Sequence, residues 1–254
     1  MLASQRFENI IAITNERGFV STKELSNLLA VTETTIRRDC EELEQQGFLL
    51  RVHGGAKSMK QKRIISYNDE TTMNERFDLN GFEKEIICKK AASFVKDGDC
   101  IFLDGGTTVV SMLKYLRGKK IKIVTHSTLI ANAFEDEDAE LFMVGGKYII
   151  KYNMSIGPIT LSTLERFNFD HVFLSCSGID IEKQMIYTTE MDTMAVKQKA
   201  FDLGIHKYML VDNSKFQVKG FCNFISSSQF DGIISNQSDV YLEDELPDNF
   251  ILVK

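Results

Sequence analysis

The sharpest signal for ligand chemistry is a five-residue run, DGGTT, that directly follows the apolar segment 100–103. We expect a strand over 100–103 and a helix over 108–116, so the run is the turn between them. Two glycines allow a ligand to approach the backbone, and a helix start offers amide groups beside the threonine hydroxyls. Such a turn can cradle a phosphate, although tight glycine turns also occur for purely structural reasons. The residues are Asp104, Gly105, Gly106, Thr107 and Thr108.

The run is neither of the common nucleotide-binding motifs. It lacks the Gly-Lys-Ser/Thr ending of a P-loop and the G-x-G-x-x-G spacing of a dinucleotide site. A small phosphorylated molecule therefore fits this turn better than a nucleotide does.

Polar residues also follow the apolar segments 121–124, 140–144, 171–175 and 207–211, each of which we expect to be a strand. Ligands of parallel sheets bind at the carboxyl ends of the strands, so these residues favour a pocket for a polyol and a phosphate. Aspartates would accept hydrogen bonds from sugar hydroxyls, and lysines would balance the phosphate charge. Lys197, in an expected helix over 191–203, either reaches this pocket or faces solvent. The further candidates are Thr125, His126, Ser127, Gly145, Gly146, Lys147, Asp180, Asp212 and Lys215.

A second kind of chemistry is indicated near the N-terminus, where hydroxyl and guanidinium groups precede the acidic run Glu41, Glu42 and Glu44 on one expected helix. A solvated helix usually carries acidic residues first and basic residues last. The reversed order suits a recognition helix, which enters the major groove of DNA by its N-terminal half. A plain solvated face remains the alternative. The candidate groups are Thr34, Thr35, Arg37 and Arg38.

The elements that must position this helix are short. We expect helices over 3–17, about 22–30 and 33–46, with Ser21 and Thr32 as the N-caps of the last two and as further candidate DNA contacts. Ser21 and Glu24 have the spacing of a reciprocal capping box. The inward faces are expected to hold Phe7, Ile10, Ile11 and Thr14 in the first helix, Leu25, Leu28 and Leu29 in the second, and Ile36, Cys40 and Leu43 in the third. The tight connection between the last two helices is typical of a helix-turn-helix.

A β-hairpin is expected next, with strands on either side of a glycine turn at residues 53–55. This hairpin would serve as a wing. Arg51, His53 and Lys57 would project from it as phosphate contacts.

Composition limits the remaining possibilities. The chain has 254 residues and a net charge of −6, but residues 1–63 carry +2 and the remainder −8. This balance argues against indiscriminate nucleic-acid binding, not against a small binding face presented twice by a dimer. No segment is long and apolar enough to span a bilayer, and no signal peptide is evident, so we expect a cytoplasmic protein. The five cysteines are scattered without metal-ligand spacing, which predicts buried, reduced thiols and no metal or cofactor.

These observations predict a winged helix-turn-helix domain over residues 1–57, a linker over 58–80 and an α/β domain with a mostly parallel sheet over 81–254. The first domain would bind an operator in double-stranded DNA, and the second a small effector. Because one small domain buries too little surface for tight specific binding, we expect a homo-oligomer, a dimer or tetramer.

Taken together, the motifs resemble the DeoR family of bacterial transcriptional regulators over nearly the whole chain. The similarity covers TTIRRD at 34–39, RVHGGA at 51–56, LDGGTT at 103–108, VGG at 144–146, GID at 178–180 and DNSKF at 212–216. Three places differ from the family pattern. The family commonly has Asn at the position of His126, Glu at that of Thr193, and Ile-Thr-Asp where this chain has Ile234-Ser235-Asn236.

The resemblance implies a repressor, usually of a sugar-catabolic operon. It also implies a C-terminal domain that is similar to ribose-5-phosphate isomerase and binds a phosphorylated sugar or polyol. The alternative is a sugar-phosphate isomerase with an accessory helical domain. An isomerase needs a carboxylate base, which the loss of Glu at position 193 disfavours, although Asp104, Asp180, Glu190 and Asp212 leave carboxylates nearby. A recognition helix and wing have no role in an isomerase, so the regulator is favoured.

Overall fold

The computed structural model describes residues 3–58, 64–66, 73–216, 218–237, 243 and 246–254. The chain forms two compact units, one of residues 1–63 with 238–246 and the other of residues 64–237 with 247–254. Each unit has its own hydrophobic core.

The first unit contains the three expected helices and the expected hairpin. Its elements are α1 (Ala3–Arg17), β1 (Phe19–Ser21), α2 (Thr22–Leu29), α3 (Glu33–Gln45), β2 (Leu49–Val52) and β3 (Gly55–Ser58). Strand β1 was not predicted, because three residues are too few to show an alternating pattern. It pairs with β3, so that the wing is a three-stranded sheet in the order β1-β3-β2.

Helix caps explain where α2 and α3 begin. The Ser21 hydroxyl accepts a hydrogen bond from the Glu24 amide at 3.1 Å, and Thr32 accepts from the Thr35 amide at 3.2 Å. The expected reciprocal half of the first cap is wrong, because the Glu24 carboxylate bonds the Arg17 guanidinium instead. Helix α2 ends at Ala30, which adopts the left-handed conformation with φ of 52°.

The core of the first unit matches most of the expected pattern. Leu28 differs, being 50% exposed. The helix turns about 100° per residue, so Leu25 and Leu29 share the buried face and Leu28 is rotated away from it. Phe7 and Ile11 are also only half-buried, at the margin of this core. The fully or nearly fully buried residues are Ile10, Val20, Leu25, Leu29, Ile36, Cys40, Leu43, Leu49 and Ala56.

The second unit alternates helices and strands. Its helices are α4 (Met73–Asp78), α5 (Gly81–Ala92), α6 (Thr107–Val110), α7 (Leu113–Leu116), α8 (Thr128–Ala133), α9 (Pro158–Leu164) and α10 (Met191–Leu203). Its strands are β4 (Cys100–Leu103), β5 (Lys122–Thr125), β6 (Glu140–Met143), β7 (Lys147–Ile149), β8 (Met154–Ile156), β9 (Phe169–Leu174), β10 (Gly178–Asp180), β11 (Met185–Thr188), β12 (Gly204–Leu210), β13 (Cys222–Ser226), β14 (Gly232–Asn236) and β15 (Phe250–Val253).

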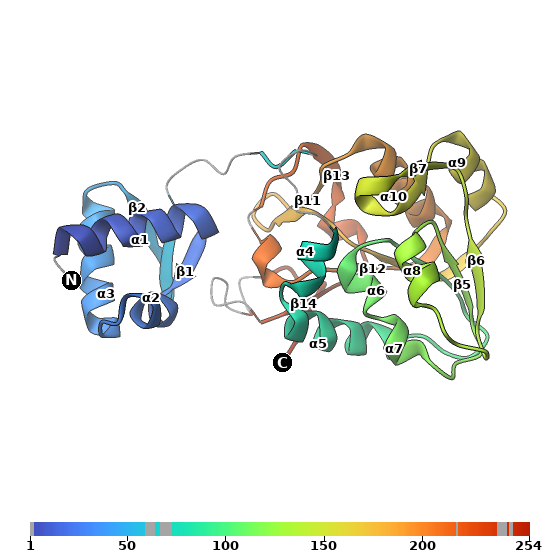
Figure 1. Ribbon diagram of the computed structural model, residues 1–254, viewed down its shortest axis with the longest axis horizontal. Helices are drawn as coiled ribbons and strands as arrows, with labels where there is room; N and C mark the ends of the chain where they lie inside the picture. The colour runs from blue at the N-terminus through green and yellow to red at the C-terminus, as the bar shows by residue number, and fades with distance from the viewer. Residues whose placement is uncertain (1–2, 59–63, 67–72, 217, 238–242, 244–245) are drawn as a thin grey trace. The chain divides into compact units, whose positions relative to one another are not determined.

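A seven-stranded sheet in the order β15-β14-β12-β9-β4-β5-β6 organises this unit, and every pairing within it is parallel. Helices α5 and α7 lie on one side of the sheet, and α9 and α10 on the other (Figure 1). The predicted parallel α/β fold is therefore confirmed.

Several elements of the second unit differ from expectation. The helix predicted over 108–116 is two short helices, α6 and α7, separated at Ser111 and Met112. Strands β14 and β15, the β7-β8 hairpin and the antiparallel sheet β10-β11-β13 were not predicted. Each of these strands is short. In the antiparallel sheet, β10 and β11 are neighbours in the chain, but β13 comes from a later segment, so no local pattern predicts the whole sheet.

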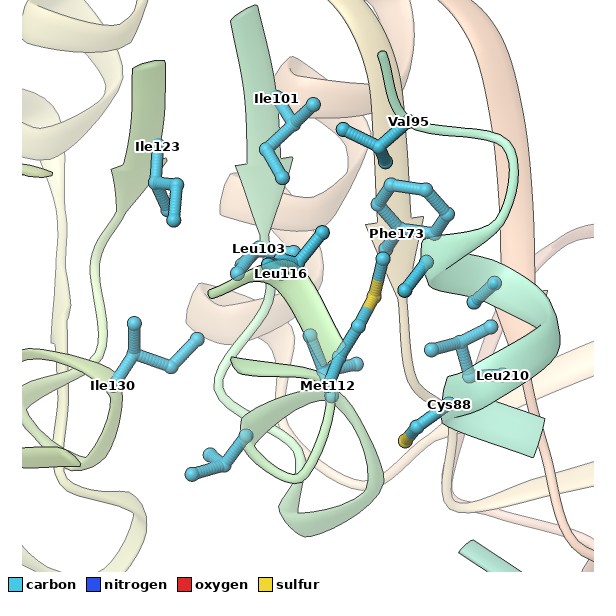
Figure 2. Close-up of a cluster of buried hydrophobic side chains, with 14 of the residues drawn as sticks. Cys88, Val95, Ile101, Leu103, Met112, Leu116, Ile123, Ile130, Phe173 and Leu210 are labelled. Carbon is cyan, nitrogen blue, oxygen red and sulfur yellow. The ribbon is translucent and has the colours of Figure 1, made fainter. Parts of the chain in front are cut away.

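The main core lies between the sheet and helices α5 to α8. Figure 2 shows strand side chains, among them Ile101, Leu103 and Phe173, beside Cys88 of α5 and Leu116 of α7. Cys40, Cys88 and Cys222 are buried as expected, whereas the residues Cys100, at the start of β4, and Cys176, just after β9, retain some exposed surface.

The segment predicted as a linker is partly built into the second unit. Ile65 forms a parallel bridge with Gly220, and Met73 at the start of α4 is 2% exposed. Among the described residues no helix has the length and apolar character needed to cross a membrane. No group of three histidine, cysteine or carboxylate side chains in this part of the chain could hold a metal ion.

Candidate functional site

Helix α3 presents the predicted reading groups to solvent. Thr34, Arg37 and Arg38 are exposed, and Thr35 is half-buried. The Arg37 side chain is 66% exposed, and its Nη2 lies 3.2 Å from Glu33 Oε2. Glu33 therefore precedes the arginines in the first turn, so the charge order is less simply reversed than the sequence pattern suggested. An exposed i, i+4 pair of this kind is weak and gives way readily to a phosphate or a base.

Two glutamates of the acidic run after the arginines contact Arg51 of the wing. The Glu44 carboxylate accepts a hydrogen bond from the Arg51 amide at 2.7 Å, and Glu41 lies 3.5 Å from the Arg51 guanidinium. These contacts attach the wing to the end of α3. His53 is exposed at the tip of the wing, and Lys57 is half-buried on β3.

Two predicted DNA contacts also serve as caps. The half-buried Ser21 holds the start of α2, and the Thr32 hydroxyl bonds both the amide of Thr35 and its hydroxyl, the latter at 2.9 Å. Their hydroxyls are thus positioned by the helix starts rather than free to rotate.

One residue pair that the sequence pattern did not reveal fixes the orientation of α3. Asp39, 5% exposed, receives Arg6 of α1 in a bidentate pair with distances of 2.5 and 3.0 Å. The pair joins two helices far apart in sequence, and Asp39 looks like one more surface charge beside the arginines.

The second unit has two adjoining hollows at the carboxyl ends of β4, β9 and β12, and the larger has about 570 Å³ of empty space that is open to solvent. Both are lined by Arg76, Gly106, Ser175 and Cys176. The smaller continues among Met73, Tyr152, Met154, Ser177, Thr188, Thr189, Thr193 and Lys197. The larger continues among Leu79, Asn80, Lys84, Thr107, Thr108, Leu210, Val211, Asp212, Ser214 and Lys215.

Six predicted effector residues line these hollows. Lys197 lines the smaller hollow, and Gly106 borders both. Thr107, Thr108, Asp212 and Lys215 line the larger one. The structure thus brings the DGGTT turn together with the turn after β12 and with helix α10.

Asp104 lies beneath the hollows in a closed network. Its side chain is fully buried and contacts Lys197, while the Ser175 amide donates to Asp104 Oδ2 at 2.9 Å. His126 Nε2 lies 3.4 Å from Asp104 Oδ1. Burial opposes ionisation, but the Lys197 charge and the His126 hydrogen bond outweigh it and hold the Asp104 pKa far below its usual value. Asp104 therefore organises the pocket floor rather than offering free oxygens to a sugar.

The remaining predicted residues of the turns after β4 and β5 are also buried. Thr125 donates to the Leu103 carbonyl at 2.7 Å and accepts from the Ser127 amide at 3.1 Å. His126 Nδ1 lies 2.8 Å from the Ser155 carbonyl oxygen. Gly105 is buried as well. These groups hold the turns together and do not line either hollow.

The two glycines of the turn are needed for packing. A Cβ at Gly106 would lie 2.2 Å from Ser175 Oγ, and one at Gly105 would lie 2.4 Å from the Met154 methyl. Real side chains never approach so closely, so a larger residue at Gly106 would disturb the Ser175–Asp104 network as well as block a ligand.

Four predicted residues lie away from the hollows. Gly145, Gly146 and Lys147 are exposed beyond β6, where Thr160 of α9 donates to the Gly145 carbonyl at 3.0 Å. Asp180 closes the β10-β11 turn by accepting from the Lys183 amide at 3.0 Å. Neither group lines the two hollows.

Sequence reasoning missed the residues that α4, α5 and the end of β9 contribute. Arg76 and Asn80 come from the segment predicted as a linker, Lys84 comes from α5, and Ser175 and Cys176 follow β9 directly. The position of Ser175 and Cys176 at the end of a predicted strand was a usable signal. Burial raises the pKa of the Cys176 thiol to about 12, so it is a neutral lining group and not a nucleophile at neutral pH.

The two units define a class of protein: a winged helix-turn-helix DNA-binding domain joined to a parallel α/β domain with a hollow at the ligand-binding edge of its sheet. The family model of the DeoR-like helix-turn-helix domain matches residues 6–62, and that of the DeoR C terminal sensor domain matches residues 79–237. The chain belongs to the DeoR family of transcriptional regulators. The family resemblance is thus confirmed, and with it a regulator rather than an enzyme.

Relatives match along most of their length. The chain is 36% identical over 225 residues to the uncharacterized HTH-type transcriptional regulator FruR of Bacillus subtilis (strain 168), covering 88% of this chain and 87% of that protein. It is 32% identical over 242 residues to the lactose phosphotransferase system repressor of Streptococcus mutans, covering 94% of each. A solved ribose 5-phosphate isomerase from Methanocaldococcus jannaschii matches with a TM-score of 0.40 and 16% identity, over 54% of this chain and 55% of that one.

Proposed function

We propose that this regulator is a repressor of a sugar-catabolic operon whose DNA affinity is controlled by a phosphorylated sugar or polyol in the hollows of the sensor unit. The observation that carries the proposal is the lining of the larger hollow. Arg76, Lys84 and Lys215 supply cationic groups, while Thr107 and Thr108 supply hydroxyls beside a helix start. Cations and donors gathered in a concave site are what a phosphate requires.

The smaller hollow is suited to the neutral part of the ligand. Among the described residues that line it, the cations are Arg76, which also lines the larger hollow, and Lys197, which is already paired with Asp104. Thr188, Thr189 and Thr193 provide hydroxyls. A sugar chain with hydroxyl groups fits such a lining. Asp212, which lines the larger hollow, is the carboxylate we assign to a sugar hydroxyl. Relatives named as lactose phosphotransferase system repressors support a role in sugar catabolism.

On the DNA side, we propose that Thr34, Thr35 and Arg37 contact base edges. Ser21, Thr32, Arg38, Arg51, His53 and Lys57 would contact phosphates. One winged domain buries too little surface for tight specificity, so the operator would be bound by a homodimer or tetramer in the bacterial cytoplasm.

Two measurements on the full chain test the proposal. Thermal unfolding is followed with ribose 5-phosphate, fructose 1-phosphate, fructose 6-phosphate and sorbitol 6-phosphate, each beside its unphosphorylated parent. A ligand that binds only the native state raises the melting temperature, so we expect at least one phosphate ester, and no parent compound, to do so. Fluorescence anisotropy with upstream DNA should show that the same ester changes DNA affinity. Equal responses to ester and parent would contradict the proposal.

A further inference from the structure

The segment between the connection to the DNA-binding unit and helix α5 forms part of the hollow lining. Met73 and Arg76 of α4 line the smaller hollow, and Arg76, Leu79 and Asn80 line the larger one. The first compact unit includes the chain up to Arg63, so α4 is the first helix of the sensor unit among the described residues. A ligand in the hollows therefore touches the segment that leads from the DNA-binding unit.

Among the described side chains of helix α4, two supply its apolar packing. Met73 is buried in a small cluster with Tyr152 and Met154, and Phe77 packs against the main core. The Arg76 guanidinium lies 5.8 Å from the centre of the Tyr152 ring, and the Lys84 ammonium bonds the Arg76 carbonyl. The helix has only six residues, so a ligand that contacts Arg76 can add to its stability.

Asn80 lies in the short connection between α4 and α5, and its side chain bonds the turn after β12. It adopts the left-handed conformation with φ of 54°, which is uncommon for a residue with a side chain. Its Nδ2 donates to Asp212 Oδ1 at 2.9 Å and to Ser214 Oγ at 3.1 Å. Asp212 and Ser214 belong to the turn after β12 and line the larger hollow. The hydrogen bonds thus fasten α4 across the rim of the site.

The larger hollow carries cationic groups that can bind an anion. Among the described lining residues, Arg76, Lys84 and Lys215 are cations and Asp212 is a carboxylate. A phosphate monoester carries close to two negative charges at neutral pH, and such cations bind it by charge-assisted hydrogen bonds. Burial lowers the pKa of Lys84, so the buried ammonium gains from the arrival of an anion.

We propose that Arg76 binds the phosphate of the effector and that the Asn80 hydrogen bonds then fix α4 against the turn after β12. The proposal rests on the proposed function and adds its regulation: the ligand orders the first helix after the interdomain connection. Because a ligand favours only the conformation it binds better, contacts to Arg76 and to the turn after β12 favour the arrangement in which both are joined. Helix α4 then both contacts the ligand and follows the connection from the DNA-binding unit in the chain.

The test uses the full chain and two probes, inorganic phosphate and the sugar esters already named. We expect Arg76→Gln to weaken phosphate and ester binding at least about tenfold, as loss of a charge-assisted hydrogen bond does. Lys199→Gln, which removes an exposed cation of α10 paired with Glu165, is the matched control and should bind as the wild type does. Unchanged affinity in Arg76→Gln would overturn the proposal, while wild-type binding of an ester would keep the proposed function intact.

Hydrogen exchange tests the fastening of α4 separately. Phosphate should slow exchange of the amides of residues 73–80 in the wild type. Asn80→Gly keeps the left-handed joint without strain but removes both hydrogen bonds, so this protection should be reduced. Protection that is absent in the wild type, or identical in Asn80→Gly, would show that α4 is not fixed by the ligand. Failure of every phosphate compound to bind the wild type would instead reject the proposed function, and this inference with it.

Discussion

The DNA-binding unit and the sensor unit use their polar candidate residues in opposite ways. Arg37 and Arg38 stand exposed on α3, and the one ion pair of Arg37 lies in solvent. Asp104 and His126 are fully buried and bonded to other protein groups. A surface that reads DNA must keep its donors available, whereas a pocket needs a rigid polar floor beneath the groups that touch the ligand. Candidate residues in the two units therefore require different tests.

The largest expected effect would break the buried network of the sensor unit. Lys197→Met leaves the Asp104 carboxylate without its cation, and breaking a buried pair in this way costs about 3–5 kcal/mol. Chemical unfolding of the full chain, with the two units followed by separate probes, should show the loss in the sensor unit alone. Lys199→Met, in an exposed pair with Glu165, should change stability by less than about 1 kcal/mol. Equal effects of the two variants would contradict the buried assignment.

The next effect concerns the one buried pair of α3. Arg6→Ala strands the Asp39 carboxylate, which is 5% exposed, and should destabilise the DNA-binding unit by about 2–3 kcal/mol. Arg17→Ala removes a guanidinium from the exposed pair with Glu24 and is the control. If both variants lose the same stability, the Arg6–Asp39 pair contributes no more than an exposed ion pair does. The contrast between the two units would then be weaker.

Arg37→Ala should affect binding rather than folding. Loss of a base-edge contact costs about 1–3 kcal/mol of operator affinity and relaxes specificity at that base, while the melting temperature stays within error because the side chain is exposed. Lys57→Ala should weaken binding to all sequences alike. Anisotropy titrations with operator and scrambled duplexes measure both effects. Unchanged selectivity in Arg37→Ala would show that α3 is not the reading helix.

The smallest expected effect lies in the turn of the helix-turn-helix. Ala30 has φ of 52°, a conformation that glycine adopts without a steric cost. Ala30→Gly should therefore change the stability of the DNA-binding unit by less than about 1 kcal/mol, in the stabilising direction, since relief of strain exceeds the added chain entropy. Thermal unfolding detects the sign. A clear loss of stability would mean that the Ala30 methyl contributes packing.

The structure also changes one expectation about the glycine turn. The sequence alone predicts that Gly106→Val blocks the phosphate and leaves a folded repressor. Because a Cβ at Gly106 would collide with Ser175, the same change disturbs the floor network. Arg76→Gln is therefore the cleaner way to separate ligand binding from folding.

Local patterns in the sequence were sufficient to predict the family, the parallel α/β fold and the helix-turn-helix. Caps at Ser21 and Thr32, and a helical period that turns Ile36 inward and Arg37 outward, depend on residues only a few positions apart. The DGGTT turn was likewise recognisable because its glycines and threonines are adjacent in the chain.

Only the tertiary structure decided which polar loop residues lie at the pocket surface and which lie beneath it. Asp104 meets Lys197 across 93 positions of sequence, and Asn80 meets Asp212 across 132. The pairing of β11 with β13 and the packing of Met73 of α4 against Tyr152 also join segments that are not adjacent in the chain. The residues that follow a strand share the same polar types whether they face a ligand or the interior. Their roles are set by which distant segment packs over them, a choice made by the global burial of apolar surface and not by local spacing.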